Sequence, residues 1–330
     1  MNISEKLINS GIEGFKGTMS KDGAFLDENG VAITSPNIGV PAEILTYLSP
    51  DAIEVLTAPR NATKLFPEII QGDWSSEAIK YRVEELSGVA VPYGDFSENG
   101  NSDINNEWIK NDVIRLQTMI KCGDLEGARN AAAKINLIAS KQKAAANTLS
   151  VYSNKAYMYG VKGLNIYGIM NHPQLPAALA SSVVSGNSTW AAKTADQIYD
   201  DIVRIMTQLE EQSAGHIDAN TSGKLAVSPK LSGFLNKKNQ WGISVKQMFK
   251  DAYPNFELVS VPEFETQAGD YAYAIANEVL GQESGNCVAQ VKMKTGPVIQ
   301  EVSGMKQKAA AACSGFRLNL PFAVARMLVA

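Results

Sequence analysis

Hydrophobic and polar residues alternate along residues 77–86, in the segment EAIKYRVEEL. One side of an extended chain would carry the apolar set Ile79, Tyr81 and Val83, and the other the charged set Lys80, Arg82 and Glu84. A period of two residues predicts a half-buried strand. Residues 114–120 alternate in the same way, whereas residues 92–107 between them are rich in Gly, Asn, Asp and Ser. We therefore expect the two strands to form a long hairpin whose polar tip has no core of its own and is either disordered or held by a partner.

Small and apolar residues recur every three or four positions from Asp124 to about Tyr159, with no proline among them. The set is Leu125, Ala128, Ala132, Ile135, Ile138, Gln142, Ala145, Leu149, Tyr152 and Ala156. The spacing predicts one continuous helix with Asp124 as its N-cap. At 1.5 Å per residue this helix would be roughly 50 Å long, so we expect a spine along which other elements lie.

Shorter elements follow the predicted spine helix. Amphipathic helices are expected at 194–212 and 244–253, and strands at 224–228, 256–261 and 271–276. Their alternation predicts a compact α/β or α+β lobe over residues 160–285. Further strand-like segments, VAQVKM, PVIQEV and GFRLNL, precede the closing segment PFAVARMLVA.

The N-terminal residues lack the apolar content of a core. Residues 1–40 are rich in Gly, Asn, Ser and Asp, which predicts an extended arm that lies on something else. Residues 41–56 predict two short helices separated by Pro50, because proline cannot donate a backbone hydrogen bond within a helix.

Composition narrows the classes of function. The net charge of the 330 residues is −4, and no dense Lys/Arg block marks a dedicated nucleic-acid binder. The isolated Cys122, Cys287 and Cys313 favour free thiols in a reducing compartment over a disulfide framework or a zinc site. Neither an export signal nor a membrane-spanning apolar run is found, so we expect a soluble protein made in the cytosol.

Three short motifs match those of penicillin-binding serine acyltransferases: SKQK at 140–143, YSN at 152–154 and KTG at 294–296. In that chemistry the nucleophile lies at the start of a helix. Ser140 is predicted midway along the spine helix, and Tyr152 would be about 18 Å further along it. This activity is therefore disfavoured.

His172, in the segment YGIMNHPQLP, is one of two histidines. No G-x-S-x-G motif, H-x-x-x-H unit or glycine-rich phosphate loop accompanies it. We expect a structural histidine that is satisfied by backbone partners, with Gly168 and Pro173 fixing the turn around it. Two alternatives stay open, a hydrolase of the lobe that uses His172 and a pH-sensitive role, since histidine titrates near neutrality. No catalytic, cofactor-binding or metal site is predicted.

The order of these elements resembles the major capsid proteins of tailed bacteriophages, whose fold is shared with encapsulin shell proteins. Three segments carry the resemblance locally: VPYGDFSENGNSD at 91–103, GLNIYGIMNHPQLP at 163–176 and LPFAVARML at 320–328. The resemblance implies an α+β fold with an N-terminal arm and short helices (1–60), an E-loop hairpin with flanking strands (61–122), a P-domain spine helix (123–160), an A-domain (161–288) and P-domain return strands (289–330).

The resemblance further implies pentamers and hexamers that form an icosahedral shell around double-stranded DNA, without sequence-specific DNA binding. A-domains would meet at the capsomer axes, and the E-loop and the N-terminal arm would lie on neighbouring copies. Separate scaffolding, portal and decoration proteins are expected as partners, with assembly in the host cytoplasm and a final place in the virion capsid. The alternative within this fold is an encapsulin-like compartment that packages an enzyme.

The resemblance implies contact residues too. Those expected between subunits are Tyr93, Asp95, Phe96, Asn99, Asp103 and Trp108, and those expected in the turn into the A-domain are Gly163, Gly168, Asn171, His172 and Pro173. Some members of the family join an E-loop lysine covalently to a neighbour's asparagine. No lysine lies between Tyr81 and Ile109, so this cross-link is not expected, and Lys80 and Lys110 at the base are the nearest candidates.

Overall fold

A computed structural model divides the chain into two units, Met1–Glu54 and Val55–Ala330. It describes residues 60–93, 95, 99–132, 136–184 and 186–330, and in the first unit the backbone of three short strands. These strands, β1 (Thr18–Met19), β2 (Phe25–Leu26) and β3 (Ala32–Ile33), form an antiparallel sheet in chain order. The rest of the predicted arm and the two helices predicted before residue 57 lie outside the described residues.

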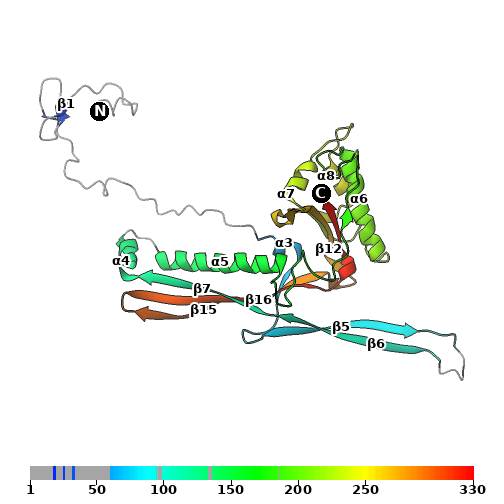
Figure 1. The fold of residues 1–330 in the computed structure, drawn as a ribbon, viewed down its shortest axis with the longest axis horizontal. Coiled ribbons are helices and arrows are strands. Elements are labelled where there is room, and N and C mark those ends of the chain that lie inside the picture. Colours follow the sequence, from blue (N-terminus) through cyan, green and yellow to red (C-terminus); the bar gives the residue numbers. More distant parts are fainter. Residues whose placement is uncertain are drawn as a thin grey trace. The chain divides into compact units, whose positions relative to one another are not determined.

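A four-stranded sheet in the order β4-β15-β16-β7 forms the long part of the second unit, and helix α5 lies along one of its faces (Figure 1). We call this sheet the spine sheet. The elements are β4 (Glu68–Ile70), β7 (Ile114–Gly123), α5 (Leu137–Tyr159), β15 (Gly285–Glu301) and β16 (Gly304–Leu318). Between helix and sheet lies an apolar cluster of Ile120, Ala145, Leu149, Ala309 and Ala311, flanked by Leu116 and Met293. The alanines of β16 let the helix approach the sheet closely.

The prediction of one continuous helix from 124 to 159 is wrong. The chain forms α4 (Asp124–Ala132) and then α5, and the side chain of Asn136 caps α5 by accepting a hydrogen bond from the backbone N–H of Ala139. Asparagine is a preferred N-cap, and it competes here with continuation of the helix. Ala145, Leu149 and Ala156 are buried as the spacing predicts, whereas Ile138 and Tyr152 are exposed.

The predicted hairpin pairs a different second strand. Strand β5 (Ala78–Val89) pairs with β6 (Asn101–Asp112) over twelve residue pairs, whereas β7 pairs with β16. The sequence of β6, NSDINNEWIKND, has no apolar alternation because both of its faces are largely exposed. Periodicity therefore identified β7, which buries one face under α5, and missed β6.

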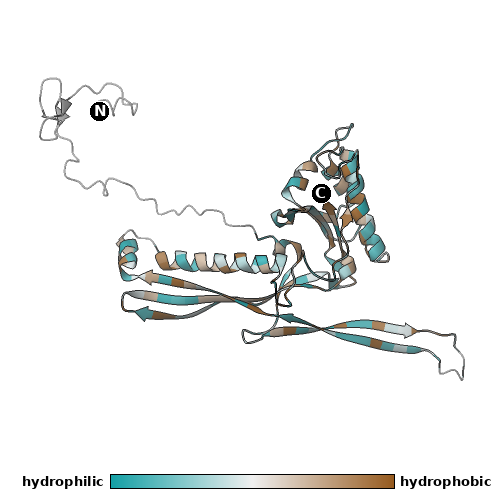
Figure 2. Ribbon diagram, viewed as in Figure 1, coloured by the Kyte–Doolittle hydropathy of each residue, from teal (hydrophilic) through white to brown (hydrophobic). Residues whose placement is uncertain are grey.

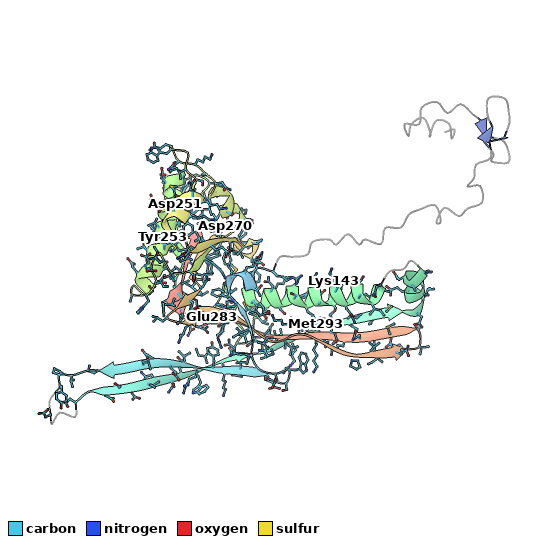
Figure 3. The ribbon with its side chains drawn as sticks, turned by 180° about the vertical axis from the view of Figure 1, so that it is seen from behind. Lys143, Asp251, Tyr253, Asp270, Glu283 and Met293 are labelled. Atoms are coloured by element: carbon cyan, nitrogen blue, oxygen red, sulfur yellow. The ribbon has the colours of Figure 1, made fainter. Side chains whose placement is uncertain are left out.

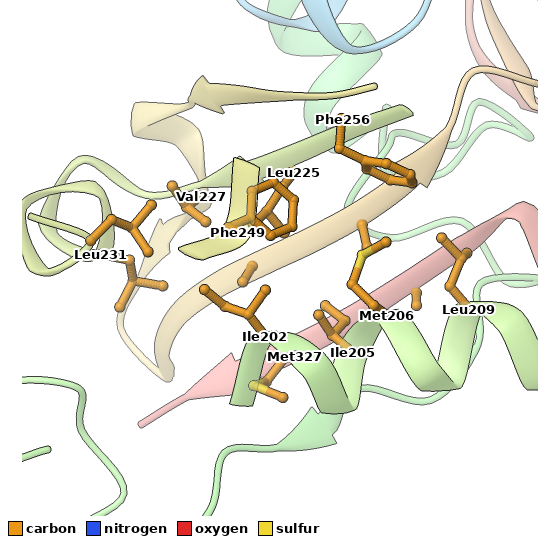
Figure 4. Packing of buried hydrophobic residues seen from close by; sticks show 14 of the residues in the cluster. Ile202, Ile205, Met206, Leu209, Leu225, Val227, Leu231, Phe249, Phe256 and Met327 are labelled. Atoms are coloured by element: carbon orange, nitrogen blue, oxygen red, sulfur yellow. The ribbon is translucent and has the colours of Figure 1, made fainter. Parts of the chain in front are cut away.

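The lobe is built on a six-stranded sheet in the order β10-β9-β12-β17-β8, with β11 at the end of β12. Its strands are β8 (Leu179–Ala180), β9 (Gly223–Val227), β10 (Phe256–Ser260), β11 (Glu265–Thr266), β12 (Gly269–Ala276) and β17 (Val324–Val329). Its helices are α6 (Ala195–Gln212), α7 (Pro229–Phe234) and α8 (Val245–Ala252). Figure 4 shows Ile202, Ile205, Met206 and Leu209 of α6 facing the sheet, opposite Met327 and near Phe249. The predicted helices at 194–212 and 244–253 and the three predicted strands are confirmed.

A second apolar cluster joins the lobe sheet to the spine sheet. It includes Tyr273 and Val324 from the lobe, Phe316 and Cys313 from β16 and Tyr157 from α5. Small elements complete this region: α3 (Ala62–Leu65), β13 (Glu278–Val279), β14 (Gln282–Glu283) and the 3-10 helices η1 (Pro262–Phe264) and η2 (Pro321–Ala323).

Residues 320–328 were predicted to return to the sheet of the spine helix, and this prediction is wrong. Strand β17 instead pairs with β12 and β8 inside the lobe sheet. It is buried on both faces, since Ala325, Met327 and Val329 join the lobe core and Val324 joins the second cluster. The return to the spine sheet is made by β15 and β16 alone.

A fully buried ion pair fixes the segment that leads into α6. Lys193 Nζ lies 2.5 Å from Asp201 Oδ2, and neither side chain is exposed. Asp201 also accepts hydrogen bonds from Trp190 Nε1 and from the backbone N–H of Ser182, both at 3.0 Å. The ammonium of Lys193 donates in addition to the hydroxyls of Ser181 and Ser182. Because every polar atom of the pair has partners, burial of the two charges is tolerated.

Candidate assembly surfaces

The β5–β6 hairpin has no core within its own chain. Most of its residues are exposed on both faces, and Leu86 and Trp108 are 80% and 64% exposed. Figure 2 shows isolated hydrophobic positions along otherwise polar strands, and Figure 3 shows side chains on both sides of the ribbon. A two-stranded hairpin is at best marginally stable in water. Its outer part is therefore suited to packing on another surface.

The base of the hairpin is fixed to the rest of the unit. The guanidinium of Arg317 lies over the ring of Tyr81, 5.4 Å from its centre. At Asp112 the backbone N–H donates to Asn165 O, and the carbonyl accepts from the Ser314 hydroxyl. These contacts hold the residues at the base of the hairpin and leave its outer part without support.

Trp74, just before the hairpin, lies between two cations. The guanidinium of Arg115 and the ammonium of Lys294 lie 5.8 Å and 5.5 Å from the centre of its ring. Arg115 also donates to the backbone carbonyls of Trp74 and Ser76. The cluster ties the loop before β5 to β7 and β15, and nothing in the sequence pattern of residues 71–77 indicated it.

The residues predicted to contact a neighbour lie at the tip and along β6. Tyr93 is 91% exposed, and Asp95 and Asn99 also lie at the surface of the tip. Asp103 and Trp108 lie on β6, whereas Phe96 is outside the described residues. Leu86 and Ile104 were not predicted as contact residues. They form a directly opposed and exposed apolar pair, and their apolar character amid polar neighbours was the available signal.

Lys80 and Lys110 are directly opposite each other near the base of the hairpin. Lys110 pairs with Asp112 at 3.2 Å. Both lysines are thus far along the strands from the tip, so the structure adds nothing in favour of a cross-link there.

The turn after α5 packs closely on the end of that helix. The side-chain amide of Asn171 joins the turn to the end of α5. Its Oδ1 accepts a hydrogen bond from the Gly168 N–H at 2.7 Å, and its Nδ2 donates to Tyr159 O at 2.8 Å. Gly163 has φ +90° and open space around it, and Pro173 is exposed.

Gly168→Ala is expected to destabilise the chain, because an added Cβ would lie 2.5 Å from the backbone oxygen of Met158. Overpacking against fixed backbone costs about 1–3 kcal/mol. Denaturant midpoints measure the change. Gly233→Ala is the matched control, because nothing lies within 4 Å of its added Cβ, and it should be close to neutral. Equal midpoints for both variants would contradict the proposed steric restriction.

His172 is buried beside aromatic rings. Its Nδ1 accepts a hydrogen bond from the backbone N–H of Gln174 at 3.3 Å, and its ring meets Tyr167 and Phe316 edge to face. Burial lowers the pKa of His172 to about 4. It therefore stays neutral near pH 7, and the hypothesis that it titrates near neutrality in the folded chain is not supported. Among the described residues, no hydrogen bond or ion pair joins the His172 ring to a serine or a carboxylate, as a hydrolase would require.

The lowered pKa of His172 predicts that the free energy of unfolding depends on pH. Its pKa is about 6.5 in the unfolded chain and about 4 when folded, so unfolding takes up a proton and stability falls as the pH drops from about 6.5 to 4. The slope is at most about 1.4 kcal/mol per pH unit. His172→Gln should flatten this part of the profile in urea unfolding at stepped pH. His216→Gln, at an exposed position, is the control and should keep the wild-type slope.

The three acyltransferase motifs do not come together in the structure. The prediction that Ser140 lies midway along a helix is wrong. Because α5 begins at Leu137, Ser140 lies in its first turn and not midway along a helix. Its hydroxyl donates to Asn136 O at 3.1 Å. Tyr152 still lies about 18 Å further along the same helix. Lys294 is beside Trp74, on the face of the spine sheet opposite α5.

The described part of the chain holds no group of three or more metal-binding side chains. A cavity of about 140 Å³ lies in the lobe, lined in part by Leu235, Lys246 and Leu258, and is smaller than ordinary ligand sites. No helix among the described residues is long and apolar enough to cross a membrane.

Comparison with known proteins gives one family match and many structural matches. The family model described as Pa193 gp26 major capsid protein matches residues 31–329. No curated protein sequence matches the chain significantly.

The chain is similar to a solved chain of the capsid of Myoviridae phage XM1, with 12% identity, a TM-score of 0.68 and coverage of 88% of this chain and 99% of that one. It is similar to a capsid chain of a native GTA particle, with 11% identity, a TM-score of 0.62 and coverage of 91% and 100%. It is also similar to a chain of Mycobacterium phage Che8, with 13% identity, a TM-score of 0.54 and coverage of 89% of this chain and 98% of that one. At these identities the structural likeness establishes the fold.

Proposed function

The chain belongs to the family of the Pa193 gp26 major capsid protein, and we propose that its copies assemble through the β5–β6 hairpin into pentamers and hexamers of an icosahedral shell. It is a major capsid protein, and thus a structural protein of the bacteriophage virion. In the proposed shell each hairpin lies on a neighbouring copy, and the lobes meet around the capsomer axes.

The observation that carries the proposal is the hairpin without a core. Its twelve-residue strands are held only at their base, and large apolar side chains such as Leu86, Tyr93 and Trp108 are exposed. Folding such an element costs conformational entropy that its own contacts do not offset. Contacts to a second copy remove this exposed apolar surface from water, and closed symmetry repeats the contact around the assembly.

The further partners are proposed on the same basis. The shell encloses double-stranded DNA without reading its sequence, in keeping with the small net charge of −4. Scaffolding, portal and decoration proteins are separate chains, and assembly takes place in the host cytoplasm. The predicted contact residues Tyr93, Asp95, Phe96, Asn99, Asp103 and Trp108 lie between subunits, held by non-covalent contacts at the tip.

The test is electron microscopy of the purified full-length chain, combined with analysis of what the particles contain. Closed shells or capsomers that fill with DNA in infected cells support the proposal. Shells that consistently hold one cargo enzyme and no DNA would instead identify an encapsulin-like compartment. A chain that stays monomeric at high concentration and with its scaffolding protein present would refute assembly.

A further inference from the structure

Helix α5 covers one face of the spine sheet. On the opposite face the loop of residues 71–77 places Trp74 against Arg115 and Lys294. Directly opposed residues of neighbouring strands share a face, so the register of β7, β16 and β15 assigns the side chains. The cations that point away from α5 are Arg115, Lys121, Lys294, Lys306 and Lys308. We call this surface the basic sheet face.

The basic sheet face is only partly neutralised within the chain. Its one carboxylate, Glu301, pairs with Lys306. Lys294 and Arg115 lie over Trp74, an uncharged ring. Lys121 and Lys308 make no side-chain ion pair with any described residue. Exposed Met119 and Ile299 lie among these cations and add apolar contact area.

The two faces of the β5–β6 hairpin differ in charge. Glu85, Asp103 and Glu107 lie on one face, because Val83 is opposite Glu107, Glu85 is opposite Asn105 and Ser87 is opposite Asp103. No hairpin residue on this face is a cation. We call it the acidic hairpin face. Over the described residues none of these carboxylates has an ion-pair partner.

The opposite face of the hairpin is internally balanced. It carries Lys80, Arg82 and Lys110 together with Glu84 and Asp112. Arg82 pairs with Glu84, and Lys110 pairs with Asp112. The unpaired charge of the hairpin is therefore concentrated on the acidic face, whose carboxylates make no ion pair among the described residues.

We propose that the acidic hairpin face of one copy packs on the basic sheet face of a second copy. This inference rests on the proposed function and specifies which two surfaces form the contact. Lengths agree as well as charges: a twelve-residue strand spans about 40 Å, and the ten to seventeen residues of β7, β16 and β15 span about 33–56 Å. Val83 and Val89 on the acidic face meet the apolar residues of the sheet face.

The charges on the two surfaces mainly determine which surfaces dock and how fast the copies associate. An exposed ion pair contributes about 0–1 kcal/mol, whereas like charges forced together oppose docking. Such contacts are screened over about 10 Å at 0.1 M salt. Assembly should therefore slow as the salt concentration rises, and reversal of charge on one surface should prevent assembly.

Charge reversal in the full-length chain tests the pairing. Glu85→Lys with Glu107→Lys reverses the hairpin face, and Lys121→Glu with Lys308→Glu reverses the sheet face. Each pair should lower the yield of shells about tenfold or more, measured by sedimentation and electron microscopy, and all four changes together should restore it. Lys80→Glu on the opposite hairpin face is the matched control and should assemble normally. These side chains are exposed, and thermal unfolding checks that each variant folds.

A milder pair of variants, Glu85→Gln with Glu107→Gln, guards against misfolding and should assemble with a rate that depends less on salt than that of the wild-type chain, because only Asp103 stays charged on the acidic hairpin face. Reversed variants that assemble normally, or a fourfold variant that folds without recovery, would overturn the pairing. Sheet-reversed shells that form normally but hold less DNA would also overturn it and assign the basic face to the genome. All these outcomes leave wild-type shells intact, whereas a wild-type chain that never assembles refutes the proposed function itself.

Discussion

Replacement of residues 83–107 by Asn-Gly is expected to abolish shell formation while the rest of the chain stays folded. The change joins Arg82 to Trp108, which are directly opposite each other, through a two-residue turn that suits a hairpin. It removes the exposed outer hairpin and keeps the base contacts of Tyr81 and Asp112. No buried cluster includes any of the residues that the structure describes in this segment.

Sedimentation velocity and electron microscopy measure the loss of assembly. Circular dichroism and the unfolding temperature serve as the control and should change little, because the removed residues stabilise no core. Shells formed at the wild-type yield by this shortened chain would contradict the assembly role of the hairpin. Loss of the folded state would contradict the description of the hairpin as an independent extension.

Asp201→Ala is expected to lower the free energy of unfolding by about 3–5 kcal/mol, the cost of leaving one buried charge without its partner. The change leaves the Lys193 ammonium buried, and it removes the acceptor of Trp190 Nε1 and of the Ser182 N–H. Because these groups hold the segment that enters α6, the lobe should be the first part to unfold. Urea unfolding measures the loss.

A double variant without charges separates the cost of the unpaired Lys193 ammonium from simple loss of packing. Lys193→Met with Asp201→Leu removes both charges and keeps side-chain volume, so it should cost less than Asp201→Ala alone. Arg204→Ala is a suitable control, because Arg204 is half exposed and lies 3.6 Å from Asp201. A double variant less stable than Asp201→Ala would contradict the account of a desolvated charge.

The elements that could be predicted from sequence are those whose burial follows a local period. Helix α6 has Ile198, Ile202 and Ile205 on one face and a capping box at Thr194, and it forms where expected. Strand β6 could not be predicted, because a strand exposed on both faces has no hydrophobic alternation. Asn136 caps α5 after the break, and the helical spacing of small and apolar residues concealed its capping preference.

Pairing partners were harder to predict than strands. The alternation of β7 and the apolar run of β17 identified both as strands, but neither pattern says which sheet receives them. The same limit applies to the assembly surfaces. Exposed residues such as Tyr93 and Trp108 were predicted to be contacts, whereas the separation of charge into an acidic and a balanced face depends on the register between β5 and β6.

Hydrogen exchange of the backbone amides in β5 and β6, compared between unassembled chains and shells, tests most directly the claim that a neighbouring copy holds the hairpin. In the unassembled chain the outer hairpin should open often and exchange quickly, because its hydrogen bonds are supported only at the base. Assembly should slow exchange over residues 83–89 and 101–107 by at least about tenfold, while β12, already buried in the lobe, stays unchanged. Equal exchange rates for the outer hairpin in chains and shells would contradict the account.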